Sequence, residues 1–196
     1  MGRGGQGPRP RQGSIVEDDS LELRTFDDSD FNQLIAAIPD ARFHLQWAGP
    51  EYTYPLDAAQ LKETLSKTIG EAPSLRVYKA VLSSTGETVG HVQLMDIDHA
   101  KLTCVLGKVL VFPAHRSRGF GRLMVRLAVE EAFTGLGMHE VTLLVFDFND
   151  AAIATYRSLG FVRSPPDPAA LPFEDESWQA IRMALARERG SENDRR

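Results

Sequence analysis

The segment Arg116-Ser-Arg-Gly-Phe-Gly-Arg122 places two glycines among three arginines, after an apolar run that stops at Pro113. A turn that leads into a helix presents free backbone N–H groups at the positive end of the helix dipole. Glycine lets an anion approach closely, and arginine supplies charge for phosphate oxygens. The segment therefore predicts an anion site at a helix N-terminus. A P-loop is excluded because no Lys-Ser or Lys-Thr follows, and the dinucleotide fingerprint because Met124 replaces its third glycine.

A second set of spaced residues follows another apolar run. From Asn149 to Phe161 the sequence reads N-x-x-A-I-x-x-Y-x-x-x-G-F. Ala152 and Tyr156 are four positions apart, so they share one face of a helix. A face that carries small residues and a single hydroxyl can lie beside a long, thin ligand.

The first segment reads R-x-x-G-x-G after V-x-V-x-P, and with the second it resembles the GNAT superfamily of N-acetyltransferases. The resemblance covers about 21–185, with its specific part over about 109–161. It implies direct transfer of an acetyl group from acetyl-CoA to a primary amine, of a small molecule or of a protein N-terminus or lysine, with CoA as product. It also implies a single-domain α/β (α+β) fold whose mixed, mostly antiparallel central sheet is splayed in a V between helices. The implied cofactor-binding residues are Val109, Leu110, Val111, Arg116, Ser117, Arg118, Gly119, Phe120, Gly121, Arg122, Asn149, Ala152 and Tyr156.

Tyr156 is the catalytic residue that the resemblance implies. A phenol of ordinary pKa about 10 stays protonated at neutral pH and can give a proton or a hydrogen bond to the departing CoA thiolate. The resemblance also implies that the backbone around Val109 and Val111 pairs with the pantetheine arm, which Asn149 hydrogen-bonds. The alternative is that the Tyr156 ring packs into the core with its hydroxyl satisfied elsewhere.

No motif in the sequence identifies the general base that would take a proton from the incoming amine. Similar enzymes that acetylate protein N-termini often carry Leu-Glu-Val where this chain has Leu143-Leu-Val145, which leaves the acceptor open. Acceptor-side candidates stand in an aromatic loop expected over 43–55 and on or after the strand expected from Thr88: Trp47, Glu51, His91, Gln93 and Asp96. A water relay is an equal alternative. Two other functions stay open: a non-catalytic acyl-CoA-sensing module, and a binding or structural protein that has lost the cofactor.

The elements that must position these residues follow from apolar periodicity and breakers. Strands are expected at 21–25, 74–82, 88–97, 102–112, 141–148 and 178–185, and helices at 31–38, 58–68, 122–134 and 150–159. A Pro-rich loop precedes the last strand. The acetyltransferase domain is expected over 20–186, with a disordered tail over 1–19 and a frayed, charged tail over 187–196.

Composition narrows the class of protein. The 196 residues are 42% hydrophobic and 25% charged, which is typical of one globular domain. A net charge of −5 argues against nucleic acid as a partner. Cys104 is the single cysteine and is expected to be a buried packing residue in a reducing, cytoplasmic compartment. The sequence shows no long apolar run for a membrane and no His/Cys cluster for a metal, and a monomer or homodimer is expected.

Overall fold

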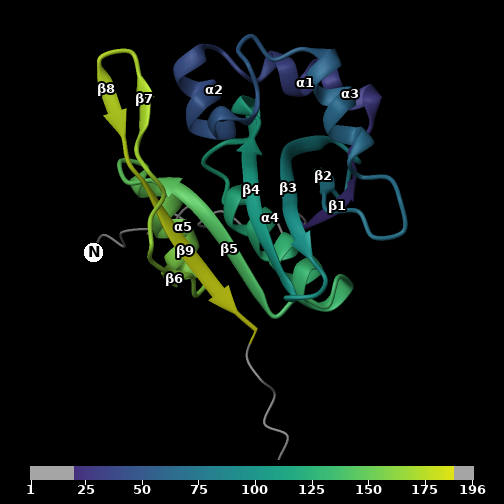
Figure 1. The fold of residues 1–196 in the computed structure, drawn as a ribbon. Coiled ribbons are helices and arrows are strands. Elements are labelled where there is room, and N and C mark those ends of the chain that lie inside the picture. The colour runs from purple at the N-terminus through teal and green to yellow at the C-terminus, as the bar shows by residue number, and fades with distance from the viewer. Residues whose placement is uncertain (1–19, 188–196) are drawn as a thin grey trace, which may run out of the picture.

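The computed structural model describes residues 20–187, which form one large sheet with helices on its face and at its end (Figure 1). The sheet order is β1-β2-β3-β4-β5-β9-β6 within this described range. All neighbours run antiparallel except β4 and β5, which are parallel. The strands are β1 Leu21–Thr25, β2 Arg76–Leu82, β3 Thr88–Asp98, β4 Thr103–Val111, β5 Glu140–Phe146, β6 Val162–Arg163 and β9 Ala180–Ala186. The expected mixed, mostly antiparallel sheet is confirmed.

The helices fall into two groups (Figure 1). One group gathers at one end of the sheet: η1 Asp28–Asp30, α1 Phe31–Ala36, α2 Ala41–Ala48, η2 Gly49–Glu51 and α3 Ala58–Ser66. The other group comes after β4 and β5 in the chain: η3 Pro113–His115, α4 Phe120–Glu130 and η4 Glu131–Gly135 follow β4, and α5 Asp150–Ser158 follows β5. Within residues 20–187, no helix combines the length and apolar character needed to cross a membrane.

The parallel pair β4 and β5 separates partway along its length. Pairing covers only Thr103–Val105 against Glu140–Thr142. Beyond these residues β4 runs on to Val111 and β5 to Phe146, while β5 stays paired with β9 along its whole length. The sheet is therefore split along β4, whose outer half offers unpaired backbone groups on that side.

A β-bulge lies in the outer half of β4. His91 pairs with Leu110 and Gln93 with Gly107, so Lys108 and its neighbour oppose a single residue of β3. Lys108 has a φ of 49°, in the left-handed region that non-glycine residues rarely adopt. Because a bulge bends its strand and changes the direction of a side chain, it places Lys108 differently from a regular strand.

The main core lies between α4 and the sheet. Met124, Val125 and Ala128 of α4 are at most 1% exposed and pack with Val92 and Leu94 of β3. Burying a Met or Val side chain contributes about 1.5–3 kcal/mol, so this face anchors α4 and the turn before it. A second core joins the helices at the end of the sheet, α1 and α3, to Leu110 of β4 and to Phe112. Cys104 is buried in the main core, and burial raises the pKa of its thiol to about 11.

Three expectations about elements were wrong in detail. The aromatic loop expected over 43–55 begins as helix α2, because the Asp40 side chain accepts a hydrogen bond from Phe43 N at 2.7 Å and caps it. Helix α4 begins at Phe120, since Gly119 in the left-handed conformation already serves as its N-cap. The strand expected from Trp178 begins at Ala180, because the Pro-rich loop and its continuation form a hairpin. Its strands are β7 Leu171–Phe173 and β8 Glu176–Trp178. The tail expected over 1–19 lies outside the described residues, as does 188–196.

Candidate active site

A first cavity of about 380 Å³ opens where β4 and β5 separate. Its walls come from elements far apart in sequence, namely α2, the outer halves of β4 and β5, the start of α4, and α5. Several residues predicted to bind the cofactor meet there: Val109, Leu110, Val111, Arg116, Gly121, Asn149, Ala152 and Tyr156. The two motifs thus lie on one cavity, with β4 and the turn on one side and α5 on the other.

The turn before α4 leaves several main-chain donors unused. Within residues 20–187, the N–H groups of Ser117, Gly119, Phe120 and Gly121 make no hydrogen bond. The amides at the start of a helix point outward along its axis, where the helix dipole favours an anion. Gly119 has a φ of 82°, and a Cβ built there would meet no atom within 4 Å. These unused donors and the open space beside Gly119 fit a pyrophosphate.

The side chains of this turn are divided between the cavity and the core. Arg116 Nε donates to Val111 O at 3.2 Å, and its guanidinium lies 5.5 Å from the centre of the Phe43 ring, on the cavity wall. Arg122 Nε donates to Ser158 Oγ at 3.1 Å, and the Arg118 guanidinium lies over the Phe120 ring. Phe120 and Leu110 are buried side chains, so a ligand can meet only their backbone.

The helix α5 contributes Asn149 and Tyr156. Asn149 Oδ1 accepts from Ala152 N at 3.3 Å and caps the helix, a role that the motif alone did not indicate. The side-chain NH₂ of Asn149 has no partner among the described residues. Tyr156 lines the first cavity and packs against Phe161 with ring centres 5.8 Å apart. Burial raises the pKa of Tyr156 to about 12, so its hydroxyl holds its proton at neutral pH.

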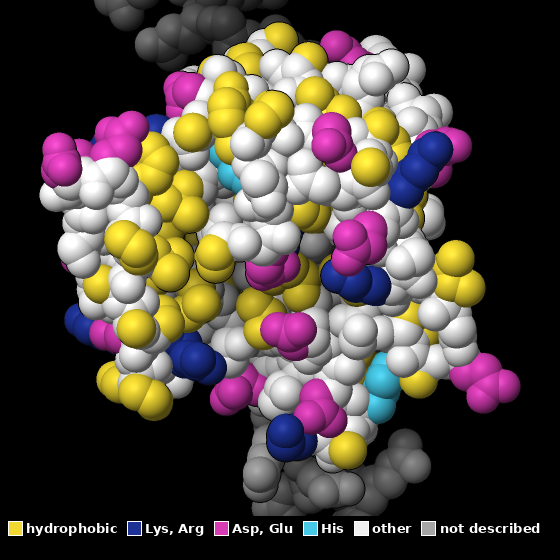
Figure 2. All heavy atoms as spheres, turned by 45° about the horizontal axis from the view of Figure 1, so that its top comes forward, with side chains coloured by type: hydrophobic (Ala, Val, Ile, Leu, Met, Phe, Trp, Pro, Cys, Tyr) yellow, Lys and Arg dark blue, Asp and Glu magenta, His cyan; other side chains and the backbone are white. Residues whose placement is uncertain are grey.

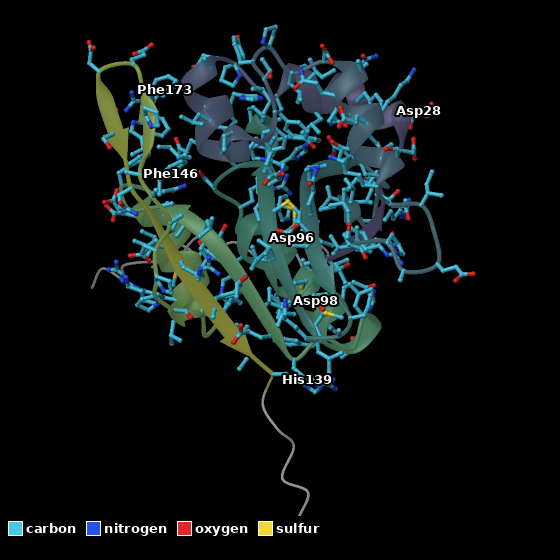
Figure 3. All side chains as sticks on the ribbon, viewed as in Figure 1. Asp28, Asp96, Asp98, His139, Phe146 and Phe173 are labelled. Atoms are coloured by element: carbon cyan, nitrogen blue, oxygen red, sulfur yellow. The ribbon has the colours of Figure 1, made fainter. Side chains whose placement is uncertain are left out.

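A second cavity of about 440 Å³ adjoins the first. The two share Gln46, Trp47, Leu106, Gly107, Lys108, Leu144, Val145 and Phe146, so they meet at the strand split. Glu51 and Asp96 line the second cavity but not the first. Figure 2 shows a hollowed face with hydrophobic side chains along one wall and acidic side chains opposite. In Figure 3, Asp96 of β3 and Phe146, the last residue of β5, lie on opposite sides of the split.

His91 and Gln93 do not reach either cavity. Both are at most 1% exposed, and Gln93 Nε2 lies 3.1 Å from His91 Nε2. The His91 ring packs edge-on against Phe26 and Trp47. Burial lowers the pKa of His91 to about 3. The side chains of these two acceptor-side candidates point from β3 toward the helices at the end of the sheet. Both are therefore core residues.

Lys108 is a site residue that the sequence analysis missed. It lines both cavities, its side chain is 2% exposed, and its Nζ lies 2.6 Å from Glu51 Oε2. The ammonium also lies 3.0 Å from Met95 Sδ and 5.3 Å from the centre of the Tyr52 ring. Desolvation lowers the pKa of Lys108, while Glu51 acts to raise it. The available signal was the one charged residue in the apolar run 102–112.

Arg182 is the second residue that the sequence analysis missed. It lies on β9, lines the second cavity and pairs across the strands with Leu144. No sequence signal marked it, since arginine is common on the exposed side of an alternating strand. The second cavity therefore combines carboxylates on η2 and β3 with cations on β4 and β9.

A split, mostly antiparallel sheet with an anion-binding turn and a second adjoining cavity defines an α/β protein that can bring two ligands together. The model of the acetyltransferase (GNAT) family matches residues 41–161. Spermidine N(1)-acetyltransferase of Escherichia coli is 26% identical over 143 residues, or 72% of this chain and 73% of that protein. The Vibrio cholerae enzyme of the same name is 27% identical over 103 residues, or 53% of this chain and 58% of that protein.

Solved structures have the same fold. Spermidine N-acetyltransferase of Vibrio cholerae in complex with CoA and spermine superposes with a TM-score of 0.72 at 21% identity, covering 85% of this chain and 95% of that chain. A dodecameric structure of the enzyme from that organism gives a TM-score of 0.67 at 21% identity, covering 85% and 93%. The chain belongs to the GNAT family of acetyltransferases. It is an N-acetyltransferase, and its acceptor is a primary amine.

Proposed function

We propose that the first cavity holds acetyl-CoA and that the second holds the amine acceptor. The observation that carries this proposal is the junction of the two cavities at the strand split, where Tyr156 lies on the first and Glu51 and Asp96 on the second. Two reactants that are held side by side in the right orientation react as if they were one molecule, which accelerates their reaction. In this arrangement the unused amides of the turn would hold the pyrophosphate, and the unpaired edge of β4 would hold the pantetheine arm.

Acetyl-CoA, when bound, supplies an acetyl group activated as a thioester. The chain itself has to manage protons. Tyr156 holds one at Oη and can donate it toward a leaving thiolate. Glu51 and Asp96 are the candidate bases that line the acceptor cavity, so either can accept the proton of an incoming ammonium, directly or through one water. Trp47 and Leu144 line the junction with apolar side chains.

Polyamines are the first acceptors to test. Two carboxylates line the second cavity, and attraction between opposite charges favours a cationic acceptor there. The similar proteins from Escherichia coli and Vibrio cholerae are named for spermidine, which supports the same choice. A peptide amine remains the other acceptor class, because the second cavity opens to the surface beside the β7–β8 hairpin.

A CoA-release assay with a panel of amines tests the proposal. Polyamines, monoamines, amino acids, aminoglycosides and short peptides are compared at saturating acetyl-CoA, and acetyl-CoA binding is measured separately by thermal shift. We expect saturable release of CoA with at least one amine. Stabilisation by acetyl-CoA without turnover on any amine would instead favour an acyl-CoA sensor, and the absence of stabilisation would contradict the cofactor site itself.

A further inference from the structure

The guanidinium of Arg182, on the wall of the second cavity, attracts Asp167 but makes no hydrogen bond with any residue over 20–187. Its Nε is buried and makes no hydrogen bond, and its side chain makes no ion pair with any described residue. Arginine carries five N–H donors in a rigid fork and is always charged. A buried donor left without an acceptor costs free energy, so this fork is suited to an acceptor group that the chain does not supply.

Asp167, the acidic side chain that acts on Arg182, already has other partners. Asp167 Oδ1 accepts from the main-chain N of Arg182 at 2.9 Å, and Asp167 Oδ2 is paired with Arg163. These two contacts, together with the charges of Arg163 and Arg182, hold the pKa of Asp167 below its usual range. Asp167 therefore fixes the backbone of β9 and attracts the Arg182 guanidinium without forming an ion pair with it, which leaves the guanidinium donors available to a ligand in the cavity.

The position of Arg182 puts this cation close to the junction of the cavities. Arg182 is the cross-strand partner of Leu144, and partners in an antiparallel pair project from the same face of the sheet. Leu144 lines both cavities. Neighbouring strands are only about 4.8 Å apart, so a small molecule can reach Arg182 with one end while its other end lies at the split.

The opposite wall carries the complementary charges. Glu51 and Asp96 lie on the side of η2 and β3, and Lys108 neutralises part of the charge of Glu51 through its ion pair. A polycation would gain from the carboxylates but would be repelled by Arg182. A molecule with an ammonium at one end and an anion at the other complements both walls.

We propose that the second cavity accepts a primary amine that also carries a carboxylate, such as an amino acid or a short peptide, and that Arg182 binds this carboxylate. The inference rests on the proposed function, since it names the acceptor of the same site. Arginine binds carboxylates with two parallel hydrogen bonds, which adds both strength and direction.

Matched acceptors test this without any variant. 6-Aminohexanoate is compared with its amide, and glycylglycine with glycylglycinamide, which differ only in the carboxylate. We expect kcat/KM to be about tenfold or more higher for the acid of at least one pair, because a hydrogen-bonded charge contributes about 1.5–3 kcal/mol. If kcat/KM for the amide equals or exceeds kcat/KM for the acid in both pairs, the inference is overturned.

Variants of Arg182 assign the effect to this side chain. Arg182→Gln should raise KM for the carboxylate acceptor about tenfold or more, with KM for the amide changed less than about twofold. Arg182→Lys should restore part of the loss, and Arg24→Gln, which changes an exposed arginine on β1 that lines neither cavity, serves as the control. A similar loss for acid and amide would mean that Arg182 is only structural. Turnover of polyamines alone would refute the inference but preserve the proposed function, whereas no turnover of any amine would refute both.

Discussion

At the scale of single residues, the proton donor that we propose is one phenol. Tyr156 lies on the first cavity, and burial in the same environment that would receive the pantetheine arm raises its pKa to about 12. Burial disfavours the ionised form of an acidic group, so the proton stays on Oη well above neutral pH. Tyr156 is therefore suited to act as a proton donor rather than as a base.

Replacing Tyr156 with Phe should lower kcat by about 100-fold while leaving the affinity for acetyl-CoA nearly unchanged, because general acid catalysis typically contributes this much. In the unmodified enzyme, kcat should show no loss from this group as pH rises until about pH 11, near the raised pKa. Steady-state rates across pH and acetyl-CoA binding measure both effects.

Tyr78→Phe is the matched control for this variant. Tyr78 donates to Glu131 Oε1 at 3.3 Å in a part of the core that borders neither cavity, so its loss should leave kcat unchanged. If Tyr156→Phe turns over like the unmodified enzyme, Tyr156 has no place in the proton transfer.

At the scale of elements, the proposed cofactor site depends on a turn and the helix that follows it. Gly119 adopts a φ of 82° and caps α4, and space lies open beside it. The buried face of α4 holds this turn in position against the sheet. The apolar pattern of the α4 sequence thus fixes the helix on the sheet, and the fixed helix sets the position of the free amides before it.

Gly119→Ala should weaken acetyl-CoA binding about tenfold or more, because the new Cβ fills the space that an anion needs and strains a left-handed backbone. The strain alone should lower the free energy of unfolding by about 1 kcal/mol. Gly137→Ala is the control, since Gly137 has a φ of 72° and equally open surroundings but borders neither cavity. Equal weakening of acetyl-CoA binding in both variants would show that strain, not the loss of space, is responsible.

At the scale of the whole molecule, contacts between the two halves of the chain hold α2 against the β7–β8 hairpin, and both elements contribute residues to the second cavity. Arg42 of α2 donates to both carboxylate oxygens of Glu176 on β8, at 3.1 and 2.9 Å. Its guanidinium also lies 4.8 Å from the centre of the Trp178 ring. Figure 1 shows the β7–β8 hairpin beside α2, where these contacts join them.

Arg42→Ala should release the hairpin from α2. We expect faster hydrogen exchange over 171–178 and a rise in KM for the amine of about two- to fivefold, with unchanged affinity for acetyl-CoA, because local openings affect the site nearest to them. Arg24→Ala, which removes an exposed ion pair on β1, is the control. Unchanged exchange in the hairpin would show that its apolar contacts suffice.

The assembly of the chain is also decided at this scale. A monomer or homodimer was expected, while a similar enzyme from Vibrio cholerae has a dodecameric structure. Light scattering of the full chain, with and without an amine, distinguishes these states.

The sequence by itself determined the elements of the proposed donor half of this protein. The glycine turn, the amphipathic helix after it and the Asn149 to Phe161 motif are each continuous in the chain, so local spacing was enough to predict them. The acceptor half was decided only by the tertiary structure. A bulge turns Lys108 toward Glu51, the orientation of β3 sends His91 and Gln93 into the core, and the pairing of β9 with β5 brings Arg182 to the cavity. These outcomes depend on strand register and on contacts between distant segments, which no local pattern encodes.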